Sequence, residues 1–280
     1  METGNSPPQL SASVSDSIKI AETVEARIRP VRGLVAILDA LGTKLLSLPE
    51  AVEFVALRDS ILQFTARVIE SGLPGLDRTR LRTFTLNDTI VYVYEAPGEI
   101  TLAEVEKFCH VLRVAETRSI VEGFPFRGAF AVGEFFVGDA QTVLGPAVND
   151  AASWFEAADW IGINATPHAT MFIQSLMEKS PDAKLEHVLT NYEVPLKHTA
   201  VKESLKAVNW PKGFYVTGAR PPGSGSTRGL VLSALSARRV PKDTESKYFN
   251  AIRFFDTVEA AQHLEERFSA TPSSAPPGTK

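Results

Sequence analysis

The 280-residue chain lacks several features that would point to common classes of protein. It has a single cysteine, Cys109, so it cannot form an internal disulfide, and we expect a reducing compartment. No apolar run reaches the roughly 18 residues of a membrane span, and the first residues lack the pattern of a signal peptide. The formal net charge of -4 provides no positive excess for nucleic acid or membrane surfaces. We therefore expect a cytoplasmic protein with no nucleic-acid or membrane partner.

Several familiar active-site motifs are also missing from the sequence. There is no GxxxxGK[ST] phosphate loop and no GxSxG nucleophile motif. None of the five histidines pairs with another at the spacing of metal ligands. Gly128, Gly133 and Gly138 do not follow the strand–GxGxxG–helix pattern of a dinucleotide site. Any chemistry must therefore come from other residues, and the carboxylates are the first to consider.

The apolar pattern predicts one main domain with additions at both ends. We expect a flexible lead at 1–31, the main domain at 32–180, an extension at 181–268 packed on or continuing that domain, and a disordered tail at 269–280. Within the main domain we expect the order β-α-β-β-α-β, followed by a helix and a strand. This order predicts an α+β, ferredoxin-like fold, a sheet with helices on one face, plus a C-terminal extension.

The expected elements follow from the spacing of apolar residues and from turn signals. Strand patterns are found at 33–39, on either side of Asn87-Asp88 within 81–98, at 124–138 as two strands joined near Gly133, and at 161–165. Helical patterns are found at 49–71, 101–122, 147–160, 168–179 and 258–268. Short strands are expected at 213–218 and 230–232, and 248–255 is compatible with either a helix or a strand.

The stretch GLVAILDALGTK, residues 33–44, contains the first candidate site residue. Asp39 follows a buried apolar strand, and an unpaired buried charge would be unfavourable there. Gly42 permits a tight turn, so that backbone N–H groups at 40–44, from Ala40, Leu41, Gly42, Thr43 and Lys44, can face a phosphate. A simple helix cap is the alternative role for Asp39.

A second carboxylate, Asp88, is expected beside the first. In a β-α-β-β topology the first strand lies next to the following hairpin, so Asp39 and the Asn87-Asp88 turn fall at one edge of the sheet. Two converging carboxylates repel each other unless a cation lies between them. We therefore expect two Mg²⁺ or Mn²⁺ ions, held by Asp39, Asp88 and Ala40. If the topology were different, Asn87-Asp88 would be only a good turn.

Four segments together resemble the class III nucleotide cyclases, and most closely the bacterial pyrimidine cyclases of Pycsar anti-phage defence. These segments are LDALG at 38–42, NDTIV at 87–91, RGAFAVGEF at 127–135 and GPAVNDAASWFEAA at 145–158. The resemblance covers about residues 33–165 and implies that 32–180 is a cyclase catalytic domain. It assigns the two metal-binding aspartates to Asp39 and Asp88. It also implies a homodimer with active sites at the subunit interface.

The sequence departs from the purine cyclases at the positions that contact phosphate and base. Asn149 is retained, but the arginine expected four residues later is Ser153. Another cation must replace it to stabilise developing phosphate charge, and Arg127, Lys44 and Arg82 are the candidates. The lysine expected before the second aspartate is replaced by Phe84 or Thr85.

Thr142 stands where an aspartate or threonine would read a purine base. The incomplete pair agrees with a pyrimidine base, and the resemblance favours UTP over CTP. The implied product is a cyclic nucleotide that activates a separate effector during phage infection. Arg127 could instead be a surface or dimer charge, and Asn149 could cap its helix. Two alternatives stay open, an adenylate or guanylate cyclase and a non-catalytic nucleotide-binding or dimerisation protein.

Overall fold

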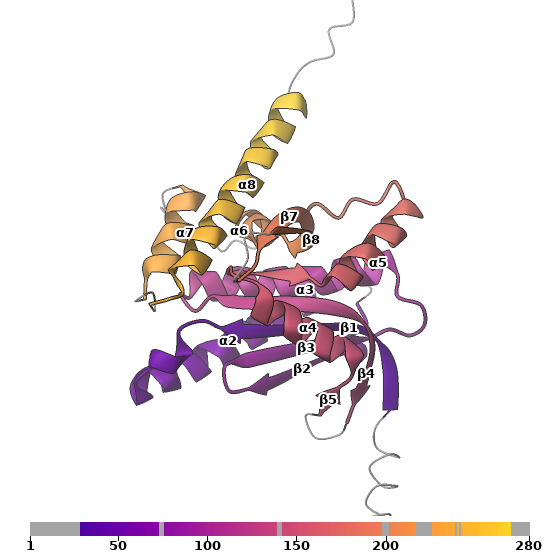
Figure 1. Cartoon of the computed structure of the whole chain (residues 1–280), viewed down its shortest axis with the longest axis horizontal. Coiled ribbons are helices and arrows are strands. Elements are labelled where there is room, and N and C mark those ends of the chain that lie inside the picture. The colour runs from indigo at the N-terminus through magenta and orange to yellow at the C-terminus, as the bar shows by residue number, and fades with distance from the viewer. Residues whose placement is uncertain are drawn as a thin grey trace, which may run out of the picture.

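A computed structural model of the chain describes residues 29–72, 76–138, 142–197, 202–216, 226–238, 240 and 242–269 (Figure 1). The predicted lead at 1–31 lies outside these residues up to residue 28, and the first strand begins at Arg29. The predicted tail at 269–280 lies outside them from residue 270 onward. No helix in the described part of the chain is both long enough and apolar enough to span a bilayer.

The described residues form one mixed sheet and its covering helices. The strands are β1 (Arg29–Ala40), β2 (Leu81–Leu86), β3 (Thr89–Glu95), β4 (Phe126–Val137), β5 (Val143–Leu144), β6 (Gly162–Ala165), β7 (Leu189–Pro195) and β8 (Lys202–Val208). The α-helices are α2 (Leu48–Gly72), α3 (Leu102–Val121), α4 (Pro146–Ala157), α5 (Pro167–Glu178), α6 (Trp210–Val216), α7 (Thr227–Ser236) and α8 (Glu245–Ser269), and η1 (Thr43–Leu45) and η2 (Arg78–Arg80) are short 3₁₀ turns.

The sheet confirms the predicted α+β fold class. Its order is β2-β3-β1-β4-β6-β8-β7, with β5 paired to β4. β1 lies in the centre and pairs antiparallel with both β3 and β4, so its central part is buried by neighbours on both sides. The first six elements follow the predicted β-α-β-β-α-β order, and β8 and β7 extend the same sheet beyond β6.

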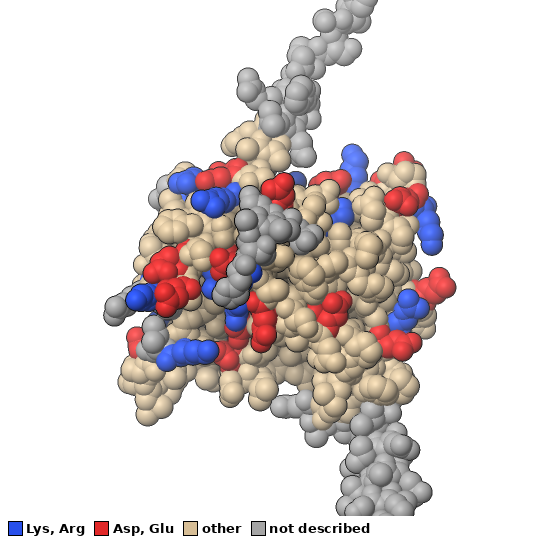
Figure 2. All heavy atoms as spheres, viewed as in Figure 1, with Lys and Arg blue, Asp and Glu red and all other residues tan. Residues whose placement is uncertain are grey.

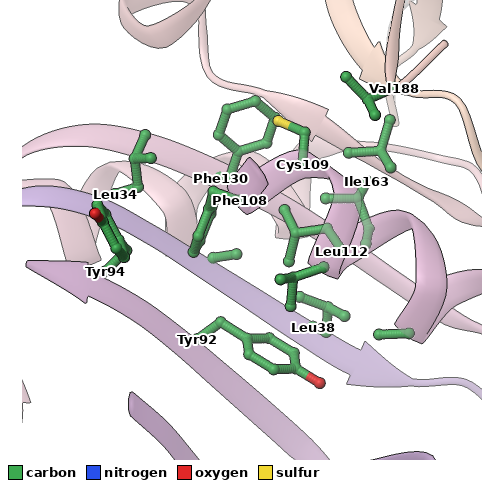
Figure 3. Packing of buried hydrophobic residues seen from close by; sticks show 14 of the residues in the cluster. Leu34, Leu38, Tyr92, Tyr94, Phe108, Cys109, Leu112, Phe130, Ile163 and Val188 are labelled. Carbon is green, nitrogen blue, oxygen red and sulfur yellow. The ribbon is translucent and has the colours of Figure 1, made fainter. Parts of the chain in front are cut away.

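The main core lies between the sheet and the helices α2, α3 and α5. Leu34 and Leu38 of β1 face Phe108 and Leu112 of α3, and Phe130 of β4 joins them (Figure 3). All five of these side chains are fully buried. The single cysteine belongs to this cluster as a buried free thiol, and burial raises its pKa. It is therefore a packing residue, as its helical position predicts.

Helix α4 covers the opposite face of the sheet. Alternate residues of β1, Val35 and Ile37, point to this face, because successive side chains of a strand alternate. They pack with Ala147 and Ala151 on the buried stripe of α4. Each face of β1 is therefore covered, which explains the continuous apolar run in its sequence.

A second core joins the C-terminal elements to the sheet. Trp160 and Trp210 are fully buried and pack against α8, with Phe254 5.0 Å from Trp160 between ring centroids and Phe255 6.0 Å from Trp210. Figure 1 shows α7 and the first part of α8 beside each other at one side of the fold. The aromatic clustering explains why this segment is ordered despite its looser sequence pattern.

Three local predictions were wrong. Residues 124–138 do not form two strands, because β4 continues through Gly133, which pairs with Gly33 of β1. Residues 213–218 and 230–232 were expected to be strands, but 213–216 belong to α6 and 230–232 to α7. Both helices pack their apolar residues into the second core, and this tertiary packing outweighs a strand-like local composition.

Candidate functional site

Strand pairing brings the two candidate aspartates together. Asp39 lies at the end of β1 opposite Thr89, and the N–H of Ala40 donates to the carbonyl oxygen of Asp88 at 3.0 Å. The β2–β3 turn is the predicted hairpin, and Asn87 adopts a left-handed φ of 52° there. Arg58 of α2 donates to the carbonyl oxygen of Asn87 at 2.7 Å, which fixes the turn against the helix. The predicted juxtaposition of Asp39 and Asp88 is therefore present.

The two carboxylates also influence each other electrostatically. Burial is the largest influence on Asp39 and raises the pKa of its carboxyl above the ordinary value of 3.8. Hydrogen bonding and positive charge from Arg127 lower this pKa, and the negative charge of Asp88 raises it. The hydroxyl of Thr43 donates to Oδ2 of Asp88 and holds the second carboxylate in place. The pair is thus fixed and repulsive, the arrangement that a cation would relieve.

Arg127 lies beside Asp39 on the neighbouring strand β4. It is the second residue of β4, paired with Asp39 of β1, and its Nε and Nη2 atoms both donate to Oδ2 of Asp39, at 3.2 and 3.0 Å. Its guanidinium carbon lies 5.3 Å from the ring centroid of Phe155 on α4. The arginine is held between a carboxylate and an aromatic ring, close to any ligand of Asp39.

The turn after β1 corrects one expectation about phosphate binding. Gly42 adopts the expected left-handed conformation, with φ 86°, but only the 3₁₀ turn η1 follows it, and α2 starts at Leu48. The N–H groups of Ala40 and Leu41 already donate to the carbonyl oxygens of Asp88 and Pro125. The predicted cradle of amides at 40–44 is therefore reduced to the N–H groups at 42–44.

A cavity of about 580 Å³ unites most of the predicted residues. Its lining comprises Asp39, Ala40, Leu41, Gly42, Thr43, Lys44, Asp88, Arg127, Phe155, Glu156, Lys242, Thr244 and Lys247. Every residue predicted from the first two motifs is included, and so is Arg127. The last three come from the chain at and before the start of α8. Sequence reasoning missed them, because that segment carries no recognisable motif.

Other predicted residues lie outside this cavity. Thr142 precedes β5, which pairs with the far end of β4 from Arg127, and Asn149 is exposed on the first half of α4. Ser153 donates its hydroxyl to the carbonyl oxygen of Asn149 at 2.8 Å. Arg82 of β2 forms an ion pair with Glu95 at 3.0 Å. Of the three cations considered for the missing arginine, only Arg127 and Lys44 line the cavity.

The aspartate pair fits a divalent cation that prefers oxygen ligands. No three His, Cys, Asp or Glu side chains converge on one point among the residues that the structure describes. The protein therefore offers two carboxylates, and other ligands would have to come from backbone, water or substrate. Mg²⁺ and Mn²⁺ are commonly bound in this way, through one or two carboxylates together with substrate phosphates.

Neither a protein-family model nor a curated protein matches the chain. Among solved structures it is similar to the guanylyl cyclase Cya2, with 17% identity and a TM-score of 0.37, over 65% of this chain and 91% of that one. It is similar to a class III adenylyl cyclase-like ATP-binding protein from Pseudomonas aeruginosa, with 12% identity and a TM-score of 0.39, over 57% and 42% of the two chains.

A bacterial light-regulated adenylyl cyclase also matches, with 13% identity and a TM-score of 0.37, over 83% and 70% of the two chains. At these identities and TM-scores the three similarities do not establish an activity for the chain. A functional conclusion therefore has to come from the residues of the cavity.

Proposed function

We propose that the protein is a metal-dependent nucleotide cyclase that converts a pyrimidine nucleoside triphosphate, UTP in preference to CTP, to its 3′,5′-cyclic monophosphate and pyrophosphate. The observation that carries this proposal is the single cavity that contains Asp39, Asp88 and Arg127 at the ends of neighbouring strands. The choice of a pyrimidine rests on the sequence resemblance and on the incomplete purine-reading positions. The roles in the cytoplasm and in abortive-infection defence, through a separate effector, rest on the resemblance alone.

The charged residues and the turn amides of the cavity would have the following roles in this reaction. Asp39 and Asp88 would hold two Mg²⁺ or Mn²⁺ ions, which polarise the attacking 3′-oxygen and neutralise the phosphates when bound. Arg127 and Lys44 would bind phosphate oxygens and take the place of the arginine missing at Ser153. The N–H groups at 42–44 would add hydrogen bonds to the same anion. The 3′-hydroxyl loses its proton to water and its oxygen attacks the α-phosphorus, while the bond from that phosphorus to the oxygen shared with the β-phosphate breaks and pyrophosphate leaves with the electron pair.

We further propose that the protein acts as a homodimer, in which a second subunit completes the site. Asn149 and Thr142 lie away from the cavity of their own subunit, which agrees with a role across an interface. Apolar side chains are exposed nearby, with Phe136 39% and Leu144 58% exposed on paired strands. Figure 2, viewed as Figure 1, shows uncharged areas between scattered charged side chains on this face. Exposed apolar side chains such as Phe136 and Leu144 favour association with another copy.

A non-catalytic nucleotide-binding protein is the second candidate. The specific observation in its favour is Ser153, whose hydroxyl is bonded within α4 and which supplies no charge where purine cyclases have arginine. The retained pair of carboxylates is the observation against it, because converging carboxylates are unfavourable without a cation to bind.

A product assay tests the proposal. The purified protein with Mn²⁺ is offered UTP, CTP, ATP and GTP separately, and the products are separated by chromatography. Cyclic UMP or CMP alone, lost in Asp39→Ala and Asp88→Ala, is the expected result. Cyclic AMP or GMP would refute the pyrimidine assignment. Binding of nucleotide without any product, also in lysate from infected cells, would favour the non-catalytic alternative.

A further inference from the structure

The C-terminal segment forms one wall of the cavity. Lys242 and Thr244 precede α8 and Lys247 lies in its first turn, and all three line the same cavity as Asp39 and Asp88. They follow Asp88 by more than 150 positions in the sequence, so no local motif connects them. The sheet contributes the carboxylates of the cavity, and this segment contributes two ammonium groups.

Lys247 is held in a defined position. The residue is only 6% exposed, and its Nζ lies 3.3 Å from a carboxylate oxygen of Asp159. The backbone of Asp159 is fixed in turn, because its carbonyl oxygen accepts from Asn250 at 2.6 Å and its N–H donates to Pro195 at 2.8 Å. A buried ammonium group is retained only where anions compensate its charge. Lys247 therefore lies preorganised at the cavity and not free in solvent.

The helix that carries Lys247 is anchored to the core. Phe254 and Phe255 are fully buried and pack against Trp160 and Trp210. These contacts begin two turns after Lys247 and prevent α8 from moving independently of the sheet. The lysines are thus part of the same packed body as the aspartates.

Positive charge accumulates at this side of the cavity. Lys197 lies next to Lys247 and Arg127. Burial is the largest cause that lowers the pKa of Lys197, and the positive charges of Arg127 and Lys247 are the next largest. Glu156 and Asp159 act in the opposite direction and do not cancel the effect. If metal ions neutralise Asp39 and Asp88, the remaining cations favour a polyanion.

We propose that Lys242 and Lys247 bind the β- and γ-phosphate groups of the nucleoside triphosphate and then the pyrophosphate that leaves. This inference rests on the proposed function, which supplies the triphosphate ligand and the step that releases pyrophosphate. When the 3′-oxygen bonds to the α-phosphorus, the electron pair of the broken bond remains on the leaving pyrophosphate oxygen. The two ammonium groups stabilise that charge. The C-terminal segment is therefore a part of the substrate site, and pyrophosphate is a product inhibitor.

The test uses inorganic tripolyphosphate and pyrophosphate as probes and measures their binding to the full-length protein by calorimetry at a fixed Mn²⁺ concentration. Lys247→Gln should weaken binding about tenfold, and the exposed Lys242→Gln about threefold, because charge-assisted hydrogen bonds are stronger where water is excluded. Lys184→Gln, an equal change at an exposed site between α5 and β7, is the matched control and should bind within about twofold of wild type. Lys247→Arg keeps the charge and should retain most of the affinity.

Two outcomes would overturn the inference. One is wild-type affinity in both glutamine variants, and the other is a wild-type protein that binds neither probe. Should Lys247→Gln fail to fold, which thermal unfolding would reveal, the comparison of Lys242→Gln with Lys184→Gln decides. Lysine-dependent binding without any cyclic product would refute the proposed function and leave this site intact. Cyclic product with unchanged affinity for the probes in the lysine variants would refute this inference and leave the proposed function intact.

Discussion

Replacing Asp39 with asparagine separates the charge of the proposed metal site from its shape. Asparagine has nearly the same volume, and its side-chain oxygen can still accept from Arg127, which donates to Asp39 at 3.0 and 3.2 Å. The two side chains are 16% and 20% exposed. The pair thus lies between a surface ion pair, at 0–1 kcal/mol, and a buried pair whose disruption costs 3–5 kcal/mol. Because burial and the negative charge of Asp88 raise the pKa of Asp39, removing this charge offsets the loss of the ion pair, and without metal we expect Asp39→Asn to leave the unfolding free energy within about 1 kcal/mol of wild type.

The larger effect should appear when Mn²⁺ is added. At a concentration a hundred times its Kd, a ligand that binds only the folded state stabilises it by about 2.7 kcal/mol. For a chain of this size, 1 kcal/mol shifts Tm by roughly 2–4 °C, so Mn²⁺ should raise the Tm of wild type by about 5–10 °C. Asp39→Asn should reduce that rise to less than about 2 °C. Removing a metal ligand should also lower the rate of cyclic-nucleotide formation by about 100-fold or more.

Differential scanning calorimetry without Mn²⁺ measures the change in stability, and the same experiment with Mn²⁺ measures the rise in Tm. Asp182→Asn serves as the control, because it is the same substitution at an exposed residue on the loop after α5, away from the cavity. If Asp39→Asn kept the full rise in Tm with Mn²⁺, the assignment of Asp39 as a metal ligand would be refuted. An equal loss in Asp182→Asn would mean that the ion binds the surface non-specifically.

Three further predictions concern the fold. Gly33→Ala should lower the unfolding free energy by more than about 3 kcal/mol or prevent folding, since a Cβ there would lie 1.8 Å from the carbonyl oxygen of Tyr94. Gly98→Ala, where a Cβ would meet nothing within 4 Å, is the control and should have the unfolding free energy of wild type when both are measured by urea unfolding. Burial lowers the pKa of His110 from 6.5 to about 4, so the unfolding free energy should fall as the pH drops from 6.5 to 4, and His110→Gln should show a smaller fall. Complete burial raises the pKa of Glu116 well above 4.5, so the unfolding free energy of wild type should fall as the pH rises above 4.5. Glu116→Gln should therefore become more stable relative to wild type over that range. A difference between the two proteins that stays constant with pH would contradict this.

The central part of the fold could be predicted because its signals are local. The apolar run before Asp39 predicts a buried strand, and Asn87-Asp88 between two β-rich runs predicts the hairpin; both are present. The segment at 124–138 misled the prediction because Gly133 resembles a turn residue. It faces Gly33 across the β1–β4 pair instead, so this glycine serves strand pairing and not a chain reversal.

The site could be predicted only as far as its residues lie near recognisable turns. Asp39, Asp88 and the residues around Gly42 come from such turns, and they meet in one cavity. Lys247 could not be found in this way, because its place depends on packing between α8 and two distant tryptophans. A long-range contact of this kind leaves no periodicity or spacing in the sequence around it. The roles assigned to Thr142 and Asn149 stay predictions, since they concern a second subunit.

The position of α8 also determines when the cavity is completed during translation. The ribosome makes β1, the β2–β3 turn and β4 first, so Asp39, Asp88 and Arg127 can meet while the messenger is still being read. Lys242 and Lys247 emerge only later, together with the helix that fixes them. A polypeptide interrupted before α8 would therefore contain both carboxylates but lack this lysine wall. If the proposed function holds, premature termination or proteolytic trimming at that point would leave the aspartates, Arg127 and Lys44 in place and remove only the contacts of Lys242 and Lys247 to the triphosphate.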